Sequence, residues 1–163
     1  MEKIININLK ERNDYINKYN KRFLSYELRN YILEELKGIN PKTKIKFSIS
    51  SDFNMEELEK NNLIDMIRTN FGADISEIIT QSKKQNLTNL LLLLIGSIFI
   101  TISIFTKIKI LSQFSLIFGW VILGESICNF FYKTIENKHK ISRRKQIVKA
   151  KAIFEKKETN NIK

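Results

Sequence analysis

Two long apolar runs dominate the pattern of hydrophobic and polar positions along the chain. Residues 87–106 contain no charged side chain, and residues 110–132 contain one, Glu125. A helix of about 20 residues is about 30 Å long, which matches the hydrocarbon core of a bilayer, and it satisfies its own backbone hydrogen bonds in lipid. Only residues 107–109 separate the runs, so the pattern predicts an antiparallel transmembrane hairpin. A buried helical pair in a soluble fold is the alternative, but such helices are usually shorter.

Shorter alternating patterns precede the apolar runs. Apolar and polar side chains alternate over residues 5–9 and again over residues 44–50, which is the period of half-buried strands. Between them, Ser25 suits the N-cap of a helix that stops at Gly38. Because a helix joins the two strands, we expect them to pair in parallel.

A second helical pattern follows these strands. Asn54 suits its N-cap, and apolar residues then recur at helical spacing. The predicted buried face consists of Leu58, Leu63, Ile64, Ile67 and Phe71. Residues 74–86 continue a helical pattern into the first span. The sequence therefore predicts a small β-α-β-α domain over residues 1–86.

Positive charge is concentrated in the C-terminal segment. The chain has a net charge of +11, and residues 133–163 hold 11 Lys and Arg against 3 Asp and Glu. Ile141, Val148 and Ala152 lie on one side of a continued helix, which predicts a basic helical tail that lies on anionic lipid. Nucleic acid is an unlikely partner in comparison, because the tail directly follows a span.

The Lys and Arg residues near the spans also predict the orientation of the chain. They gather after residue 132 and at residues 83–84, whereas the link contributes only Lys107 and Lys109. We therefore expect a multi-pass protein of the cell (inner or cytoplasmic) membrane, with both termini cytoplasmic. The predicted fold class is α+β, in three parts: a cytosolic domain over 1–86, a hairpin over 87–132 with spans 87–106 and 110–132, and a tail over 133–163.

Residues for familiar catalytic chemistry are scarce. The only histidine is His139 in the basic tail, and the only cysteine, Cys128, lies within the second span. None of the five glycines forms a phosphate-binding loop motif. The acidic cluster at residues 56–59 is interpreted as stabilising a helix N-terminus. We therefore expect no catalytic residues, no metal site and no cofactor, and we predict that the protein is not an enzyme.

The second span carries the candidate functional residues, an intramembrane polar and packing site at Gly119, Trp120, Glu125 and Asn129. Three interpretations of Glu125 stay open: a polar contact between helices, an ion site, or a position at the membrane interface. Trp120 is mid-span, which favours contact with protein. Small residues at 112, 115 and 119 allow a close helix approach, either to the first span or to a second copy.

Short motifs resemble a family of uncharacterised bacterial membrane proteins. The motifs are residues 24–32 (LSYELRNYI), residues 45–49 (IKFSI) and residues 118–125 (FGWVILGE). The resemblance implies a small N-terminal cytosolic α+β domain before two spans, with a G-W-V…E motif in the second span. Gly124 stands where the family pattern has an aromatic residue. The resemblance implies no activity.

The leading hypothesis is a non-enzymatic integral membrane protein that serves as a membrane-anchored protein-interaction or regulatory module. Its expected partners are the lipid bilayer, anionic lipid at the basic tail, and a protein partner or a second copy at the cytosolic domain. The alternative is a small oligomeric channel, transporter component or membrane-acting toxin that uses the polar face of the second span around Glu125.

Overall fold

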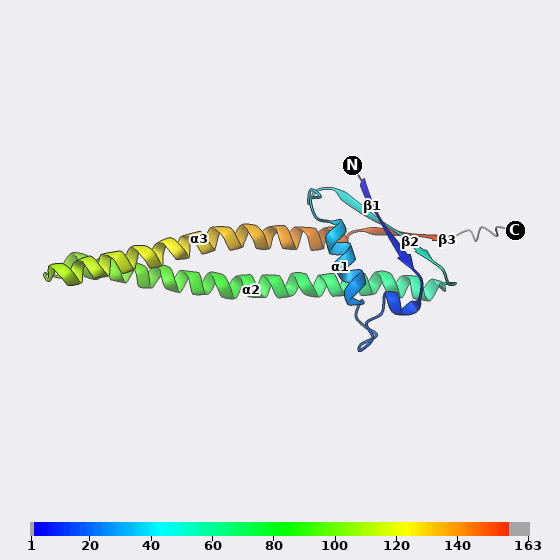
Figure 1. Cartoon of the computed structure of the whole chain (residues 1–163), viewed down its shortest axis with the longest axis horizontal. Coiled ribbons are helices and arrows are strands. Elements are labelled where there is room, and N and C mark those ends of the chain that lie inside the picture. The colour runs from blue at the N-terminus through cyan, green and yellow to red at the C-terminus, as the bar shows by residue number, and fades with distance from the viewer. Residues whose placement is uncertain (1, 157–163) are drawn as a thin grey trace. The chain divides into compact units, whose positions relative to one another are not determined.

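The computed structural model describes residues 2–156, which form three strands, a short 3-10 helix and three α-helices (Figure 1). In chain order they are β1 (Glu2–Leu9), η1 (Arg12–Asp14), α1 (Tyr26–Glu35), β2 (Lys44–Ser51), α2 (Glu57–Phe105), α3 (Lys109–Val148) and β3 (Lys151–Lys156). The chain divides into two compact units. An α/β unit combines Met1–Ser76 with Ile141–Lys163, and a helical hairpin comprises Glu77–Lys140.

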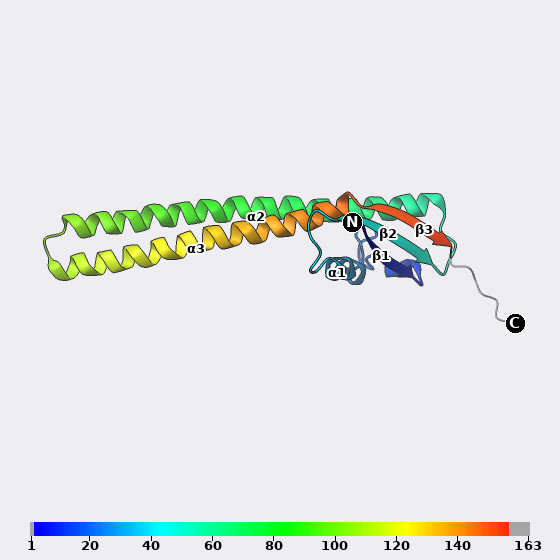
Figure 2. The ribbon, with the colours of Figure 1, turned by 90° about the horizontal axis from the view of Figure 1, so that it is seen from above.

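The α/β unit contains a wholly parallel sheet in the order β1-β2-β3 (Figure 2). Ile5 pairs with Phe47, and Phe47 pairs with Ala152 on the other side. Parallel strands need a crossover connection. Helix α1 makes the crossover between β1 and β2, and the crossover between β2 and β3 contains both long helices. The mixed α and β content is therefore confirmed, and the hairpin is an insertion within one crossover of the sheet.

Strand β3 corrects the prediction of a basic helical tail over residues 133–163. The tail is helical only as far as Val148, and Lys151–Lys156 is a strand paired with β2. The helical prediction placed Ala152 on a face with Ile141 and Val148. In the structure these residues instead follow the two-residue period of a strand, and Ala152 and Phe154 pack against the core. Residues 157–163 of the predicted tail lie outside the described residues.

One face of the sheet packs on the helices of the unit. Alternate residues of β1 and β2 are buried, and so is one face of the first turns of α2. Leu58 was predicted to share that face but is exposed, because α2 begins at Glu57 and its first turn lies outside the core. The central buried side chains are Ile5, Ile7, Leu9, Leu28, Ile32, Leu36, Ile45, Phe47, Ile49, Leu63, Ile67, Phe71 and Ile147.

The hairpin consists of the remaining parts of α2 and α3. Residues predicted as separate helices and as the first span form one helix of 49 residues, and α3 has 40. Both helices are long and apolar enough to cross a bilayer, and only 17% of each apolar window is buried within the protein. The outer surface of the hairpin is therefore apolar.

Candidate functional site

The inner side of the hairpin is lined by small and polar side chains. In α2 they recur every seven residues, at Ser82, Asn89, Gly96 and Ser103. In α3 they are Ser112, Ser115, Gly119 and Ser126. A seven-residue repeat keeps one seam facing a partner helix. We call these eight residues the seam. The seven-residue spacing in α2 is present in the sequence, but the surrounding leucine run makes it hard to recognise there.

Two glycines make the closest approach within the seam. A Cβ atom on Gly119 would lie 2.6 Å from Cγ1 of Ile100 and 3.0 Å from the carbonyl oxygen of Gly96. Nearby, the Ser112 hydroxyl donates to the carbonyl of Ser103 at 2.6 Å. The small residues of α3 therefore pack on the first apolar helix, which was one of the two alternatives left open by the sequence.

The structure does not gather the four predicted site residues. Gly119 lies in the seam and Asn129 is half-buried, whereas Glu125 is exposed on the outer surface of the hairpin. Trp120 is 65% exposed and has no protein neighbour that covers it among the described residues. Glu125 and Trp120 therefore face whatever surrounds the hairpin, while Gly119 faces the partner helix.

Two polar side chains are buried in the seam without partners. Ser126 is fully buried and Asn89 is 6% exposed, yet the Ser126 hydroxyl and the Asn89 Nδ2 have no hydrogen-bond partner among the described residues. Further along, Asn137 donates to the Ser82 hydroxyl at 2.8 Å. A polar contact such as the one between Asn137 and Ser82 favours one helix register, because mispairing these groups in apolar surroundings is costly. A path for ions along the seam would have to pass the contact between Gly96 and Gly119.

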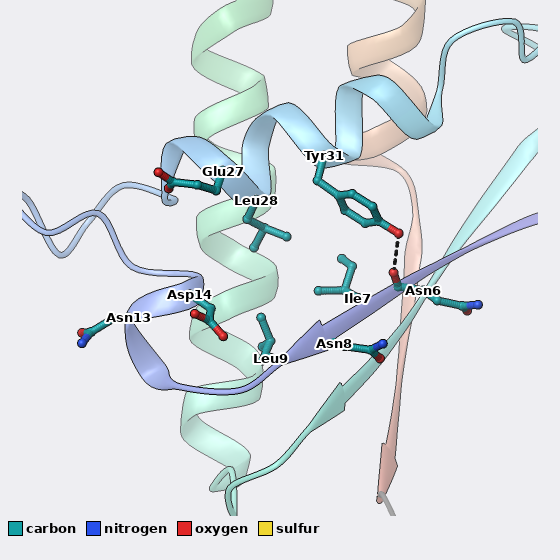
Figure 3. A pocket seen from close by; sticks show the side chains of 9 residues that line it. All are labelled: Asn6, Ile7, Asn8, Leu9, Asn13, Asp14, Glu27, Leu28 and Tyr31. Carbon is teal, nitrogen blue, oxygen red and sulfur yellow. Dashed lines mark hydrogen bonds between the residues drawn. The ribbon is translucent and has the colours of Figure 1, made fainter.

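A groove runs between α1 and the outer edge of β1 (Figure 3). It has a volume of about 520 Å³. The Tyr31 hydroxyl reaches down from α1 and donates to the carbonyl oxygen of Asn6 at 2.8 Å. The remaining lining residues are Ile7, Asn8, Leu9, Asn13, Asp14, Glu27 and Leu28. The groove therefore combines apolar side chains with the backbone of a strand.

The backbone of β1 faces this groove at alternate residues. The Leu9 carbonyl accepts from the Asp52 N–H at 2.9 Å, so Leu9 faces β2, whereas the Asn6 carbonyl faces α1. Because peptide groups alternate along a strand, the N–H and C=O of Asn8 also point away from β2. Strand β1 pairs with β2 alone and is an edge of the sheet. Because Tyr31 binds the Asn6 carbonyl, the N–H and C=O of Asn8 are the outer backbone groups that this edge offers to a further strand.

Two titratable groups that line the groove have shifted pKa values. The backbone N–H groups of Lys10 and Glu11 donate to Asp14 at 2.7 and 3.0 Å. The donors at Glu11 and Lys10 hold the pKa of the Asp14 carboxyl below its ordinary value of 3.8. Burial raises the pKa of Tyr31, and Glu35 adds to that rise.

A carboxylate fixes three helices of the α/β unit to one another. Asp74 of α2 accepts from Arg29 of α1 at 2.7 Å and from Arg144 of α3 at 3.1 Å. The side chains of Asp74 and Arg144 are only 12% and 17% exposed. Among the described residues, no group of His, Cys, Asp and Glu is arranged to hold a metal ion. The Asp74 cluster joins α1, α2 and α3 within the α/β unit.

Comparisons of the chain with protein-family models, with curated proteins and with solved structures found no match. The resemblance to a two-span membrane protein family stays a prediction. The structure defines a class of architecture, a parallel three-stranded α/β unit with an apolar helical hairpin inserted between its second and third strands.

Proposed function

We propose that the protein is a membrane-anchored protein-interaction module without enzymatic activity. In this proposal the hairpin spans a cell membrane, the α/β unit is cytosolic, and an extended segment of a partner protein binds along the edge of β1. The open edge of β1 beside the groove is the observation that carries the binding role.

Membrane insertion is supported by the inverted distribution of side chains in the hairpin. Small and polar residues face inward, and large apolar residues such as Leu91, Phe131 and Trp120 face outward. In water this arrangement would expose a large apolar surface, which soluble monomers avoid. In lipid it is favourable, because small residues at helix interfaces allow close packing and the tails cover the large residues.

The orientation follows from the basic residues that flank the hairpin. Residues 133–163 hold 11 Lys and Arg, against two in the link between the helices. Positively charged segments close to spans are retained on the cytoplasmic side. Both strands that flank the hairpin in sequence, β2 and β3, belong to one sheet, so they must lie on the same side of any membrane that the hairpin crosses.

The edge of β1 offers the two requirements for strand addition. Backbone donors and acceptors supply affinity, and a groove that accepts alternate side chains supplies specificity. Asn8 provides the outward backbone groups, and Ile7, Leu9 and Leu28 provide an apolar floor. An exposed edge strand is also prone to pair with another chain. A second copy of the protein is therefore the other candidate for this edge.

The channel hypothesis receives less support from the geometry. Glu125 is exposed on the outer surface of the hairpin, and Gly96 and Gly119 close the seam. A pore lined by Glu125 would therefore have to form between several copies. Because the proposal for the β1 edge needs only one copy and one partner segment, it is the simpler account.

The experiment that tests the binding role uses a photo-crosslinking amino acid at Glu27, on the α1 side of the groove, in the full chain within its membrane. We expect one discrete cross-linked segment, identified by mass spectrometry, and none from a probe at Lys37. Asn8→Pro removes an outward N–H without removing a β1–β2 hydrogen bond. It should abolish the cross-link.

Asn8→Ala is the matched control, because both substitutions remove the contact of Asn8 with Ser50 but only proline removes the N–H. The alanine variant should keep the cross-link. Equal cross-linking in the proline and alanine variants would contradict strand addition. A cross-link to a second copy of this chain would assign the edge to self-association.

A further inference from the structure

A second hollow in the α/β unit lies where the three parallel strands begin. It has a volume of about 570 Å³. The loop before β2, the first residues of β2 and β3, and the last turns of α3 line it. These segments are distant in sequence and contribute six lysines, namely Lys42, Lys44, Lys46, Lys145, Lys149 and Lys151.

The lysines have little counter-charge. Glu2 is the only acidic residue among the described residues that line the hollow, and its carboxylate is bound by Lys46 at 2.7 Å. The other five lysines form no ion pair with the described residues. Like charges gathered in a concave surface raise the local potential, which attracts and concentrates anions. A bound anion would offset the mutual repulsion of these exposed lysines.

We infer that this hollow, the lysine pocket, is a binding site for a phosphate-bearing anion. The pocket has the size of small-ligand sites, which range from about 300 to about 1,000 Å³. Its lining contains no aromatic side chain on which nucleic acid bases would stack. It contains no arginine, so recognition depends on several flexible ammonium groups around a compact, highly charged group.

Basic residues of the C-terminal segment, which the sequence predicted to lie on anionic lipid as part of a helix, line the lysine pocket instead. Ile147 and Ala150 are buried in the core, and Ile153 is the large apolar side chain of β3 that stays exposed, so this segment offers little apolar surface to lipid. Lys145, Lys149 and Lys151 instead meet Lys42 and Lys44 from the N-terminal half of the unit. The anion has two possible sources, a phospholipid headgroup or a soluble phosphorylated molecule. This proposal is independent of the proposal for the β1 edge. A negative result at one site does not affect the proposal for the other.

The test uses the full chain in nanodiscs and two probes. Calorimetric titration of inorganic pyrophosphate into phosphatidylcholine nanodiscs measures the soluble source. Native mass spectrometry of protein released from nanodiscs with and without phosphatidic acid measures the headgroup source. The test variant is Lys44→Gln/Lys145→Gln/Lys149→Gln. Its matched control is Lys10→Gln/Lys18→Gln/Lys21→Gln, which removes equal charge from exposed positions outside the lysine pocket.

We expect at least one probe to bind, and the test variant to weaken it about 100-fold, since each lysine near an anionic group contributes roughly a factor of five. The control should weaken it about twofold or less. If the triple variant does not fold, Lys149→Gln alone should weaken binding about fivefold. Pyrophosphate binding assigns a soluble ligand, and selective retention of phosphatidic acid assigns a headgroup. Absence of both, or equal loss in test and control, would overturn the inference.

Discussion

Helices α2 and α3 pass through both units of the chain, yet they bury opposite kinds of side chain in each. Within the α/β unit, α2 buries Leu63, Ile67 and Phe71 and exposes polar residues. Within the hairpin the same helix turns Gly96 inward and large apolar residues such as Leu91 outward. The backbone of α2 is one continuous helix, so the difference between the two segments comes from their surroundings.

With the hairpin in a membrane, as proposed above, two driving forces explain the contrast. In water, burial of apolar area stabilises the fold, so the buried side chains are large. In lipid, the tails are as apolar as leucine, so helices associate through close packing and polar contacts of small residues. Substitutions at equivalent inward and outward positions should therefore have opposite consequences in the two units.

The largest expected effect is in the core of the α/β unit. Phe71 is fully buried, and Phe71→Ala should destabilise the unit by about 3–5 kcal/mol, because it removes apolar area and leaves a cavity. Hydrogen exchange of the β2 amides in nanodiscs measures the change. Leu91→Ala, at an outward position of the hairpin, is the control and should leave β2 protection unchanged. Equal losses in both variants would remove the contrast.

The Asp74 cluster should give the next largest effect. Asp74→Asn leaves Arg29 and Arg144 without their shared carboxylate and should cost about 2 kcal/mol, less than a fully buried pair because Arg29 is partly exposed. Urea unfolding followed by circular dichroism measures the change in the free energy of unfolding. Asp65→Asn, at an exposed position of the same helix, is the matched control and should change it little.

The glycines of α3 should respond with opposite signs. Gly119→Ala places a methyl group against Ile100 and Gly96 and should destabilise the hairpin by about 1–3 kcal/mol. Gly124 has open space around it, so Gly124→Ala should stabilise the helix by up to about 1 kcal/mol through its higher helix propensity. Unfolding of the hairpin in mixed micelles distinguishes them. Destabilisation by both substitutions would place Gly124 in a contact as well.

The smallest effect concerns acid stability of the α/β unit. The pKa of Asp14 is lowered by the N–H groups of Glu11 and Lys10, so its ionised form favours the folded state. This contribution is fully present above the ordinary pKa of 3.8 and is lost as the pH falls through the lower folded pKa. Asp14→Ala should therefore lower the melting temperature at pH 6 and have less effect at pH 2. An equal effect at both values would contradict the assigned cause.

The strands show where sequence patterns suffice and where they do not. Alternation over residues 5–9 and 44–50 predicts β1 and β2, because each strand has one buried face. Strand β3 lacks this alternation, because Ala152, Ile153 and Phe154 are consecutive apolar residues, and it follows a long helix at once, so its apolar residues also fit a helical face. Pairing with β2, across more than 90 intervening residues, decides between a strand and a helix for this segment. The local sequence pattern does not encode that long-range contact.

The candidate sites were predictable to a different extent. Small residues in the second apolar run predict close packing, and Gly119 is in the seam. The exposure of Trp120 and Glu125 depends on the rotation of α3 against α2, which a uniformly apolar run does not specify. Neither the groove beside β1 nor the lysine pocket was predictable, because the strand order decides which edge is open and which lysines meet.

The most direct test of the membrane hairpin is cysteine accessibility in intact cells. With Cys128→Ala as background, a single cysteine is placed at Ile108, in the link between the helices, or at Lys37, in the α/β unit. A membrane-impermeant maleimide should label Ile108→Cys in intact cells and Lys37→Cys only after lysis. Labelling of Lys37→Cys in intact cells, or protection of Ile108→Cys until lysis, would contradict a hairpin that crosses the membrane with the α/β unit in the cytosol.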